Sequence, residues 1–402
     1  MMNILIITNF FHPYNRIASF RMNAFAKYLK EAGYSVTVVT ESDHDEIAEW
    51  NGCEIHYVKN PVATYTVKDQ MRVYCRHMNF RTVLNRFMLR YALDCKYFWR
   101  QHAYAEVKRI VRLKHIDIIL TSFSEISSHL IALQLKKNKF PFFWIADMRD
   151  EMSRNYEIPR FVTERMEPYE RKILNAADLV LSVSKPLIDD FRSRCCHNRF
   201  LEIRNGYDYD EIHDVSFQRH FTMAYFGRLS QDLKRSNNWF RAFAELIEEK
   251  KLPSDALIKI VGNYAELTIP ESIQSNVIQI DEVPHSEAIK MFREVDTLVL
   301  VHKTGRKGVY TGKVFDYLAS NKPILALCDP TDVIATLLDE TKAGFIVDEA
   351  DIAGVKNMIL RCYTIWKNEE VLPRDWDKIR QYSRKNQVRN LVKYLLSQKK
   401  LN

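Results

Sequence analysis

Short apolar segments with the pattern of β-strands alternate with helix-like segments along almost the whole chain. The first strand-like run is NILIIT at 3–8, and a helix-like run at 19–32 leads to a second strand-like run at 35–40. Four more strand-like runs follow, at 116–121, 142–147, 179–183 and 201–204. Alternation of this kind predicts parallel sheets with helices on both faces, so we expect an α/β protein.

A second series of strand-like runs starts at residue 222. Its members lie at 222–227, Leu257–Val261, Val277–Ile280, Thr297–Val301, Ile324–Leu327 and Gly344–Val347. The polar stretch DYDEIHDVSFQRH at 208–220 is the expected linker. Because 402 residues exceed one ordinary core, we expect two doubly wound, Rossmann-like domains, 1–207 and 221–372, that face a central cleft. A helical pattern fills most of 373–402, and packing back on the first domain is one arrangement for it.

The net charge of +8 is concentrated in one segment. Residues 68–114 hold 12 Lys and Arg, three Asp and Glu, and eight aromatic residues. This composition suits an anionic membrane surface, but it also suits two solvated helices with aromatic residues in the core, or a nucleic-acid site. No nucleic-acid motif accompanies the charge, so we do not expect nucleic acid as a partner.

The location of the protein is predicted from features that the sequence lacks. No segment approaches the roughly 20 apolar residues of a membrane span, and the N-terminus passes into a strand-like run without a basic leader. The seven cysteines show no CxxC spacing, which favours reduced thiols and no zinc site. We therefore expect a cytoplasmic protein without a bound metal.

Ionisable residues follow two of the strand-like runs in the first half. The loop after the first run has no glycine and carries Arg16 and Arg21 at the start of a helix, a suitable place for an anionic group. At the end of the strand-like run 142–147, Asp147, Arg149 and Asp150 lie close together in the sequence. If all three are buried, Arg149 would hold both carboxylates ionised. The alternatives are plain helix-start arginines and a structural ion pair.

Cationic residues and a helix that begins on glycine mark the second half. Arg228 ends the run AYFGR, and Lys234 follows it; both side chains suit a diphosphate. The stretch TGKVFDYLASNKPILAL at 311–327 starts a helix at Gly312, where free backbone N–H groups attract phosphate. Asp316 lies one turn further, where a carboxylate is placed to bind sugar hydroxyls.

Several segments, taken in order, resemble a known family. They are NILIITNFFHP with SFRMNAFAKYLKEAGYSVTVVT, PFFWIADMRDEM, ADLVLSVSKPLIDDF with EIRNGYD, AYFGRL, and TGKVFDYLASNKPILAL. Together they resemble the retaining glycosyltransferases of the GT-B fold in glycosyltransferase family 4 (group 1). The resemblance implies an N-terminal domain that binds the acceptor and a C-terminal domain that binds a nucleotide-sugar.

For the donor, the resemblance implies roles for single residues. The donor diphosphate would be held by Arg228, Lys234, Thr311, Gly312 and Lys313. Asp316 stands in place of the usual glutamate and would bind the ribose, while Val283 and Pro284 would lie near the base. Two departures concern this site: Gly308 occupies the position of the sugar-facing glutamate, and Lys234 is displaced by one position, so Arg235 is an alternative to it.

For the acceptor side, the resemblance implies that Arg149 and Asp150 face the donor sugar and the acceptor as the catalytic pair. In the first loop, Arg16, Ser19 and Arg21 would contact an anion or the acceptor. The glycines usual in this loop are absent, which changes how the loop would fit a diphosphate.

The expected activity is transfer of a sugar, with retention, from a nucleotide-sugar to an acceptor hydroxyl, without metal or cofactor. We expect the donor to be UDP-linked. The basic aromatic segment favours an enzyme at the inner face of the membrane, with a lipid-linked saccharide as acceptor in O-antigen, lipopolysaccharide or capsule synthesis. The alternatives are a non-catalytic binder of membranes or anionic polymers on the same fold, and a nucleotide-sugar epimerase of similar architecture.

Overall fold

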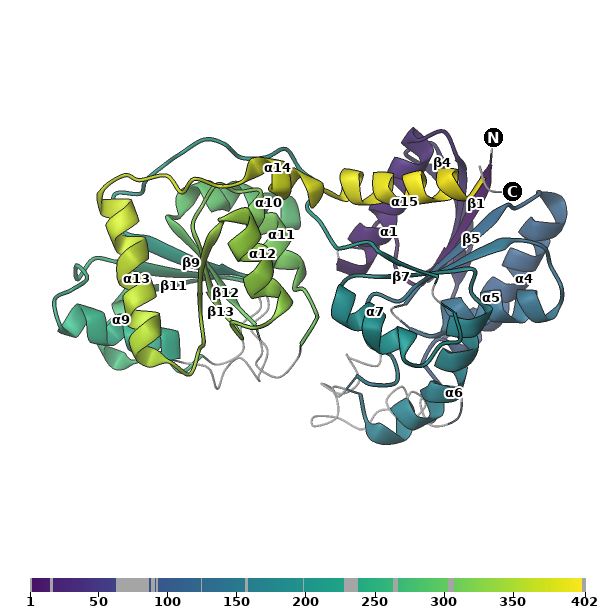
Figure 1. Ribbon diagram of the computed structural model, residues 1–402, viewed down its shortest axis with the longest axis horizontal. Coiled ribbons are helices and arrows are strands. Elements are labelled where there is room, and N and C mark those ends of the chain that lie inside the picture. Colours follow the sequence, from purple (N-terminus) through teal and green to yellow (C-terminus); the bar gives the residue numbers. More distant parts are fainter. Residues whose placement is uncertain are drawn as a thin grey trace. The chain divides into compact units, whose positions relative to one another are not determined.

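The computed structural model describes residues 2–14, 17–62, 87, 91, 93–123, 125–155, 158–197, 199–227, 238–262, 267–302 and 307–399. The chain forms two compact units. The first comprises Met1–Arg204 and Gln387–Asn402, and the second comprises Asn205–Asn386. Each unit contains one mainly parallel sheet with helices on both faces, so the predicted α/β class with two parallel-sheet domains is confirmed (Figure 1).

The sheet of the first unit has eight strands in the order β3-β4-β2-β1-β5-β6-β7-β8. They are β1 (Asn3–Thr8), β2 (Ser35–Ser42), β3 (Glu46–Trp50), β4 (Cys53–Lys59), β5 (Ile118–Ser122), β6 (Phe143–Asp147), β7 (Leu179–Ser182) and β8 (Phe200–Glu202). Neighbouring strands pair in parallel except for the β3–β4 hairpin. The central strands are buried on both faces, which explains their continuous apolar sequences.

The β3–β4 hairpin was not predicted. Trp50 pairs with Cys53 across a two-residue turn, and both turn residues have positive φ, 50° at Asn51 and 72° at Gly52. Such a turn favours Asn-Gly, because its twist matches that of the two strands. The dipeptide Asn51-Gly52 between two strand-like runs is therefore the signal that indicates this hairpin in the sequence.

Helices cover both faces of the first sheet. They are α1 (Ile17–Glu31), α4 (Tyr97–Leu113), α5 (Ser127–Lys137), α6 (Arg160–Ala176), α7 (Lys185–Arg192) and α15 (Arg384–Lys399). On one face, Phe25 of α1 and Leu391 of α15 pack with Ile6 and Val38 of the sheet, and Figure 1 shows α1 and α15 on the same side. On the other face, α4 buries a stripe that includes Trp99 against β2 and β4.

The sheet of the second unit has six parallel strands in the order β11-β10-β9-β12-β13-β14. They are β9 (Thr222–Phe226), β10 (Leu257–Val261), β11 (Val277–Ile280), β12 (Thr297–Val301), β13 (Ile324–Leu327) and β14 (Gly344–Val347). The helices are α9 (Asn238–Glu248), α10 (His285–Met291), α11 (Gly312–Leu318), α12 (Val333–Thr341), α13 (Ile352–Lys367) and α14 (Trp376–Gln381). Figure 1 shows α9 and α13 on one face and α10, α11 and α12 on the other, in agreement with the two apolar cores.

The unit boundaries differ from the expected ones. The segment 208–220, expected to be a linker, belongs to the second unit, where Ile212 is buried and its N–H donates to the Ala319 carbonyl at 2.8 Å. The single C-terminal helix expected from the pattern is two helices, α14 and α15, and the division between units falls after Asn386. A polar, unpatterned sequence can thus form a segment that packs on a domain, and the sequence pattern alone does not distinguish such a segment from a linker.

The two chain passages near this boundary lie side by side within the second unit. Tyr207 and Ser383 form a parallel bridge, and the Arg384 N–H donates to the Tyr207 carbonyl at 2.8 Å. A Cβ atom on Gly206 would lie 2.3 Å from the Tyr382 carbonyl oxygen. The glycine of the Asn-Gly-Tyr-Asp motif is therefore required by the close approach of the returning chain.

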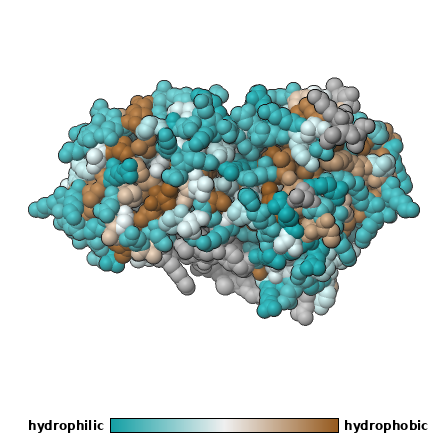
Figure 2. Space-filling view, in the orientation of Figure 1, coloured by the Kyte–Doolittle hydropathy of each residue, from teal (hydrophilic) through white to brown (hydrophobic). Residues whose placement is uncertain are grey.

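The outer surface is mainly hydrophilic on the face that Figure 2 displays, with apolar side chains in separate small groups. Among the described residues, no helix is both long and apolar enough to span a bilayer.

Candidate active site

The carboxyl ends of the six parallel strands of the second unit lie at one edge of the sheet. The strand order reverses beside β9, since β10 and β11 lie on one side of it and β12 to β14 on the other. In open α/β sheets, ligands bind in the crevice at such a switch point. The residues that follow β9 and β10 are glycines, Gly227 and Gly262.

These two glycines bring three pieces of chain close together. Gly227 has a φ of 107° and Gly262 a φ of 132°, which side chains with a Cβ atom rarely adopt. A Cβ atom on Gly262 would lie 2.5 Å from the Gly227 carbonyl oxygen, and one on Gly227 would lie 2.6 Å from Cε of Lys313. The glycines therefore leave room for the lysine at the switch point.

Lys313 is held over the end of β9. Its ammonium nitrogen lies 4.1 Å from the ring centroid of Tyr225 and donates a hydrogen bond to the Tyr225 hydroxyl. Lys313 is the second residue of α11, whose N-cap is Thr311 in an extended conformation and without a side-chain capping bond. The structure thus brings Thr311, Gly312 and Lys313 to the same place as Gly227.

Asp316 lies further along α11 and contacts the start of α10. Its Oδ2 atom is 2.9 Å from Nε2 of His285, which directly follows Val283 and Pro284. Its Oδ1 atom is buried and, within the part of the chain that the structure describes, has no hydrogen-bond partner. The predicted ribose residue and the predicted base-side segment are therefore joined through His285, which the sequence reasoning missed. The sequence signal was a Pro-His pair at a helix start, directly after a strand.

Gly308 holds the loop that leads to α11. Its φ is 80°, and its N–H donates to Oδ1 of Asp332 at 2.8 Å. The same oxygen accepts from the Val333 N–H at 2.7 Å and so caps α12. A positive φ and a backbone anchor explain why glycine stands here, at the position where the family has a glutamate.

Arg228, Lys234 and Arg16 lie outside the described residues, so their roles stay predictions.

Arg21, predicted to contact an anion or the acceptor, has a different place in the first unit. It is buried, and its Nε and Nη2 atoms donate to both carboxylate oxygens of buried Asp147 at 3.0 and 2.7 Å. It also donates to the carbonyls of Ile203 and Arg204 at 2.9 and 3.1 Å. A guanidinium with these partners braces α1 against the sheet. Arg21 is therefore a structural residue, because these bonds occupy it inside the core.

Ser19, Arg149 and Asp150 lie at the carboxyl ends of the first sheet. Ser19 is buried and its hydroxyl donates to the Tyr14 carbonyl at 2.5 Å, which fixes the first loop. Arg149 donates from Nε to the Phe123 carbonyl at 2.6 Å, and its Nη2 lies 3.9 Å from Oδ2 of Asp150. Both members of this loose ion pair keep part of their surface exposed.

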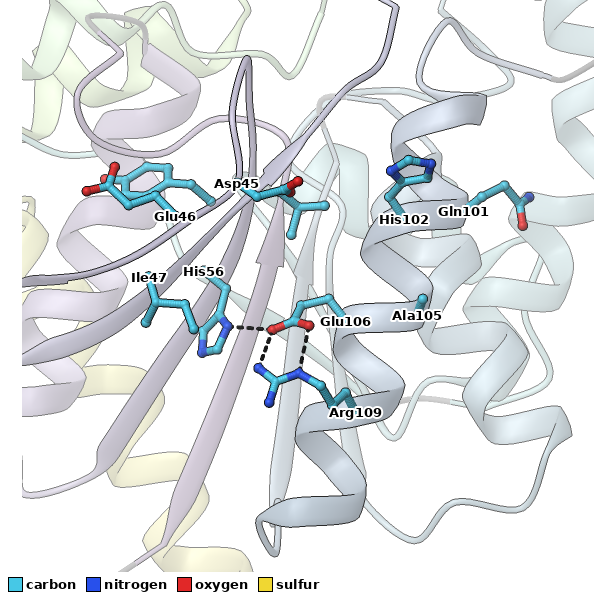
Figure 3. Close-up of a pocket in the computed structure, with 11 residues that line it drawn as sticks. Asp45, Glu46, Ile47, His56, Gln101, His102, Ala105, Glu106 and Arg109 are labelled. Carbon is cyan, nitrogen blue, oxygen red and sulfur yellow. Dashed lines mark hydrogen bonds and ion pairs between the residues drawn. The ribbon is translucent and has the colours of Figure 1, made fainter.

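A separate groove of about 690 Å³ lies between α4 and the β3–β4 hairpin in the first unit (Figure 3). Its polar groups bond mainly one another: Nδ1 of His56 lies 2.6 Å from Oε1 of Glu106, and Arg109 donates to both oxygens of Glu106 at 2.7 and 2.9 Å. These bonds hold α4 against the edge of the sheet, and we assign no chemistry to the groove.

Comparison with known proteins agrees with this architecture. Residues 19–211 match the model of Glycosyltransferase Family 4. The solved structure of sucrose-phosphate synthase from Thermosynechococcus elongatus has a TM-score of 0.69 at 13% identity, over 100% of both chains. This chain is a glycosyltransferase of the GT-B type. The predicted family resemblance and the predicted GT-B fold are thus confirmed.

Two further solved structures are similar to this glycosyltransferase. The UDP-forming α,α-trehalose-phosphate synthase from Burkholderia xenovorans, in complex with glucose-6-phosphate, has a TM-score of 0.62 at 12% identity and covers 98% of this chain and 100% of its own. A solved structure described as trehalose-6-phosphate from E. coli bound with UDP-2-fluoro glucose has a TM-score of 0.62 at 10% identity and 98% coverage of both chains. No curated protein sequence matches the chain. At these identities the likeness establishes the fold, and the substrates of the glycosyltransferase are proposals.

Proposed function

We propose that this glycosyltransferase moves a sugar from a UDP-sugar to a hydroxyl group of a lipid-linked saccharide, with retention at the anomeric carbon. The observation that carries the proposal is the position of Lys313 above Gly227, at the switch point of the second sheet. A fixed cation beside exposed backbone at the carboxyl ends of parallel strands suits the diphosphate of a nucleotide-sugar. The UDP-2-fluoro glucose bound in one similar structure, and the UDP-forming reaction in the name of another, favour uridine as the nucleoside.

The donor diphosphate is proposed to lie between Lys313 and the loop after β9. Thr311 and Gly312 contribute backbone N–H groups, while Arg228 and Lys234 complete a cationic clamp. Fixed positive groups of this kind stabilise the negative charge that develops on a leaving diphosphate, which is usually the largest catalytic effect. In this proposal the clamp takes the place of a metal, and the nucleotide-sugar is a co-substrate, so no cofactor takes part.

The nucleoside is proposed to lie over α10 and α11. Asp316 accepts hydrogen bonds from the ribose hydroxyls, and Val283 and Pro284 border the base. On the acceptor side, Arg149 and Asp150 face the reacting sugar. In a front-face reaction, the leaving phosphate oxygen takes the proton of the acceptor hydroxyl, so the protein supplies orientation and charge rather than a separate base.

The lipid-linked acceptor is proposed from the surface of the first unit. About half of the basic segment 68–114 lies outside the described residues. Within its described part, Trp99 is a core residue, whereas Phe87, Tyr91, Tyr97 and Phe98 are exposed. Exposed aromatic residues beside basic ones favour the interface of an anionic membrane. We therefore propose that the enzyme acts at the inner face of the membrane, in synthesis of a surface polysaccharide such as O-antigen or capsule.

Titration calorimetry with UDP, GDP and ADP tests the donor proposal, and we expect UDP to bind most tightly. Turnover of the corresponding nucleotide-sugar separates an enzyme from a non-catalytic binder, and the absence of an epimeric nucleotide-sugar product removes an epimerase. Two acceptor preparations, a lipid-linked saccharide in vesicles and glucose-6-phosphate, separate the proposed acceptor from a sugar phosphate. Failure of all three nucleotides to bind the folded protein would overturn the proposal.

A further inference from the structure

A histidine lies between two carboxylates at the place where α4 packs on β4. The side chain of His56, on β4, is only 4% exposed. Its Nδ1 atom lies 2.6 Å from Oε1 of Glu106 on α4, and its Nε2 atom lies 2.6 Å from Oε1 of Glu54 on the same strand. Figure 3 shows the imidazole directed from the strand toward Glu106 of the helix. His56 is therefore a direct polar link between the sheet and α4.

The two partners decide the charge of this imidazole. Hydrogen bonds from Lys114, and then from His56, lower the pKa of Glu54. A hydrogen bond from Arg109, and to a smaller extent one from His56, lowers the pKa of Glu106. Both carboxylates are therefore ionised at neutral pH, and an ionised carboxylate only accepts hydrogen bonds. Each ring nitrogen must then carry a hydrogen, so the two contacts require the imidazolium form of His56.

The two carboxylates continue into a longer row of alternating charge. The Lys114 ammonium, directly after α4, donates to both oxygens of Glu54 at 2.6 and 2.7 Å. The Arg109 guanidinium donates to both oxygens of Glu106 at 2.9 and 2.7 Å. We call these five residues, with His56 at the centre, the charge row. Histidine is the one member whose charge ordinarily changes between about pH 5 and 8.

Further charged groups surround His56 on the elements packed against it. The register of β3 pairs Ile47 with His56, which leaves Glu49 opposite Glu54 on the same face of the sheet. The groove, β2 and the start of α4 add Asp45, Glu46, His102, Glu41 and Lys96. Lys96 already donates to Glu41 at 2.9 Å, so it does not replace the proton of His56. Carboxylates outnumber cations among these groups, and loss of the proton leaves them less compensated.

Deprotonation of His56 breaks the charge row whichever nitrogen loses its hydrogen. A neutral imidazole donates from one nitrogen only, so one carboxylate then faces a lone pair. The carboxylates of Glu54 and Glu106 also repel each other once no positive charge lies between them. The apolar contacts of α4, which include buried Val107 and Ile110, do not depend on this proton. The helix is therefore loosened at this end rather than lost from the sheet.

We propose that the charge row is a pH-sensitive latch, which holds the C-terminal half of α4 on the sheet edge while His56 is protonated and releases it as the pH rises. The folded arrangement uses the protonated ring and the unfolded chain does not, so the stability from the latch is present at mildly acidic pH and lost above it. On the acid side it is lost again once the pH falls well below 4.5, the ordinary pKa of Glu54 and Glu106. Because this half of α4 forms one wall of the groove in Figure 3, release of the latch widens the groove.

Amide hydrogen exchange of the full chain, read by mass spectrometry at about pH 6 and about pH 8, tests the latch. After correction for the intrinsic effect of pH, exchange in the C-terminal half of α4 should be about tenfold faster at the higher pH, as for loss of one good hydrogen bond. His56→Gln never carries the charge, so its corrected exchange should be the same at both pH values. The matched control is His102→Gln, an exposed histidine on the same helix and the same groove, and it should keep the wild-type dependence.

Two further measurements keep the test decisive. Glu106→Gln keeps the size of the side chain and removes one carboxylate, so it should also reduce the pH dependence, even where His56→Gln does not fold. NMR of the wild type with nitrogen-15 in its histidine rings should show both nitrogens of His56 protonated at about pH 6. The latch is refuted by a neutral His56 ring at that pH, by corrected exchange of α4 that does not change with pH, or by a wild-type dependence in His56→Gln or Glu106→Gln.

Discussion

Nε2 of His285 lies 2.9 Å from Oδ2 of Asp316, which joins the first residue of α10 to the middle of α11. The two residues are 31 positions apart in the sequence and belong to segments that follow different strands. Their contact turns two separate predictions, a ribose residue and a base-side segment, into one unit. Any change to Asp316 therefore acts on His285 as well.

Asp316→Asn should weaken UDP binding about tenfold, because it removes a charge that accepts hydrogen bonds from hydroxyl groups. Calorimetry with UDP and with its 2′,3′-dideoxyribose analogue measures the effect. The wild type should prefer UDP, and the variant should lose most of that preference. Equal affinity of the wild type for both ligands would remove Asp316 from the ribose site.

Asp316→Glu restores the usual residue of the family but adds a methylene group toward His285. Because Oδ1 is already buried and Oδ2 contacts the imidazole, we expect Glu to be accepted poorly in the wild-type background. The double variant Asp316→Glu with His285→Ala should recover UDP affinity relative to Asp316→Glu alone, which a double-mutant cycle measures. If the effects of the two changes on UDP affinity are additive, the contact with His285 is not the reason why glutamate is accepted poorly at position 316.

Most strands of both sheets were predictable because they are continuous apolar runs between polar segments; the exceptions are β3 and β4, which the sequence analysis did not expect. In the second unit, the bounds of β10 to β14 match the predicted runs. The contact between His285 and Asp316 was not predictable, since neither residue carries a local signal of its partner. Arg21 was predicted to contact a bound anion because it lies near a helix start. In the structure its guanidinium instead bonds the carboxylate of Asp147, 126 positions away in the sequence. Local patterns thus identify elements, and long-range pairing decides which ionisable residues remain available.

Lys313→Met should weaken UDP binding by about 1.5–3 kcal/mol, the usual contribution of a hydrogen bond to a charged group. The change in stability should be smaller, because the contact with the Tyr225 ring contributes about 0.5–1 kcal/mol at a partly exposed site. Calorimetry and thermal unfolding measure the two effects. The matched control is Lys307→Met, on the loop that leads to α11 and paired with Asp329 at 3.1 Å, and it should leave UDP affinity unchanged. Equal losses in both variants would contradict a specific role for Lys313.

Glu349 should make the stability of the protein depend on pH. Burial, and then the charge of Asp348, raises the pKa of Glu349 from 4.5 to about 7. Its Oε1 atom is buried and finds no hydrogen-bond partner in the described chain. The folded state therefore holds this proton more tightly than the unfolded state, and the associated stability is lost as the pH rises from about 4.5 to about 7.

Glu349→Gln should remove this part of the pH dependence, because glutamine keeps the shape and does not titrate. Urea unfolding across this pH range measures the effect, and the variant should be more stable than the wild type above about pH 7. The control Glu248→Gln, on the exposed side of α9, should keep the wild-type slope. The assignment is wrong if Glu349→Gln has the same slope as the wild type.

Arg374 should be one of the most important residues for the stability of the second unit. It is buried, and its guanidinium donates to the carbonyls of Leu318 at 2.8 Å, Ala343 at 3.2 Å and Lys322. Leu318 is the last residue of α11, so Arg374 satisfies a carbonyl that the helix itself leaves unpaired. Burial lowers the pKa of Arg374 to about 9, which agrees with a site almost without water.

Arg374→Met keeps much of the apolar stem but leaves these buried carbonyls without donors. We expect a loss of about 3 kcal/mol or more in the free energy of unfolding, because each buried carbonyl left without a donor costs about 1–3 kcal/mol. The control is Arg241→Met, whose arginine is exposed and pairs with Glu245 on the same helix; its loss should stay below about 1 kcal/mol. UDP binding should weaken in Arg374→Met, which loses the anchor of α11, and not in Arg241→Met. The free energy of unfolding and the UDP affinity are therefore measured on each variant. A loss in Arg374→Met no larger than in Arg241→Met would show that water replaces the guanidinium, and that α11 needs no anchor at its C-terminal end.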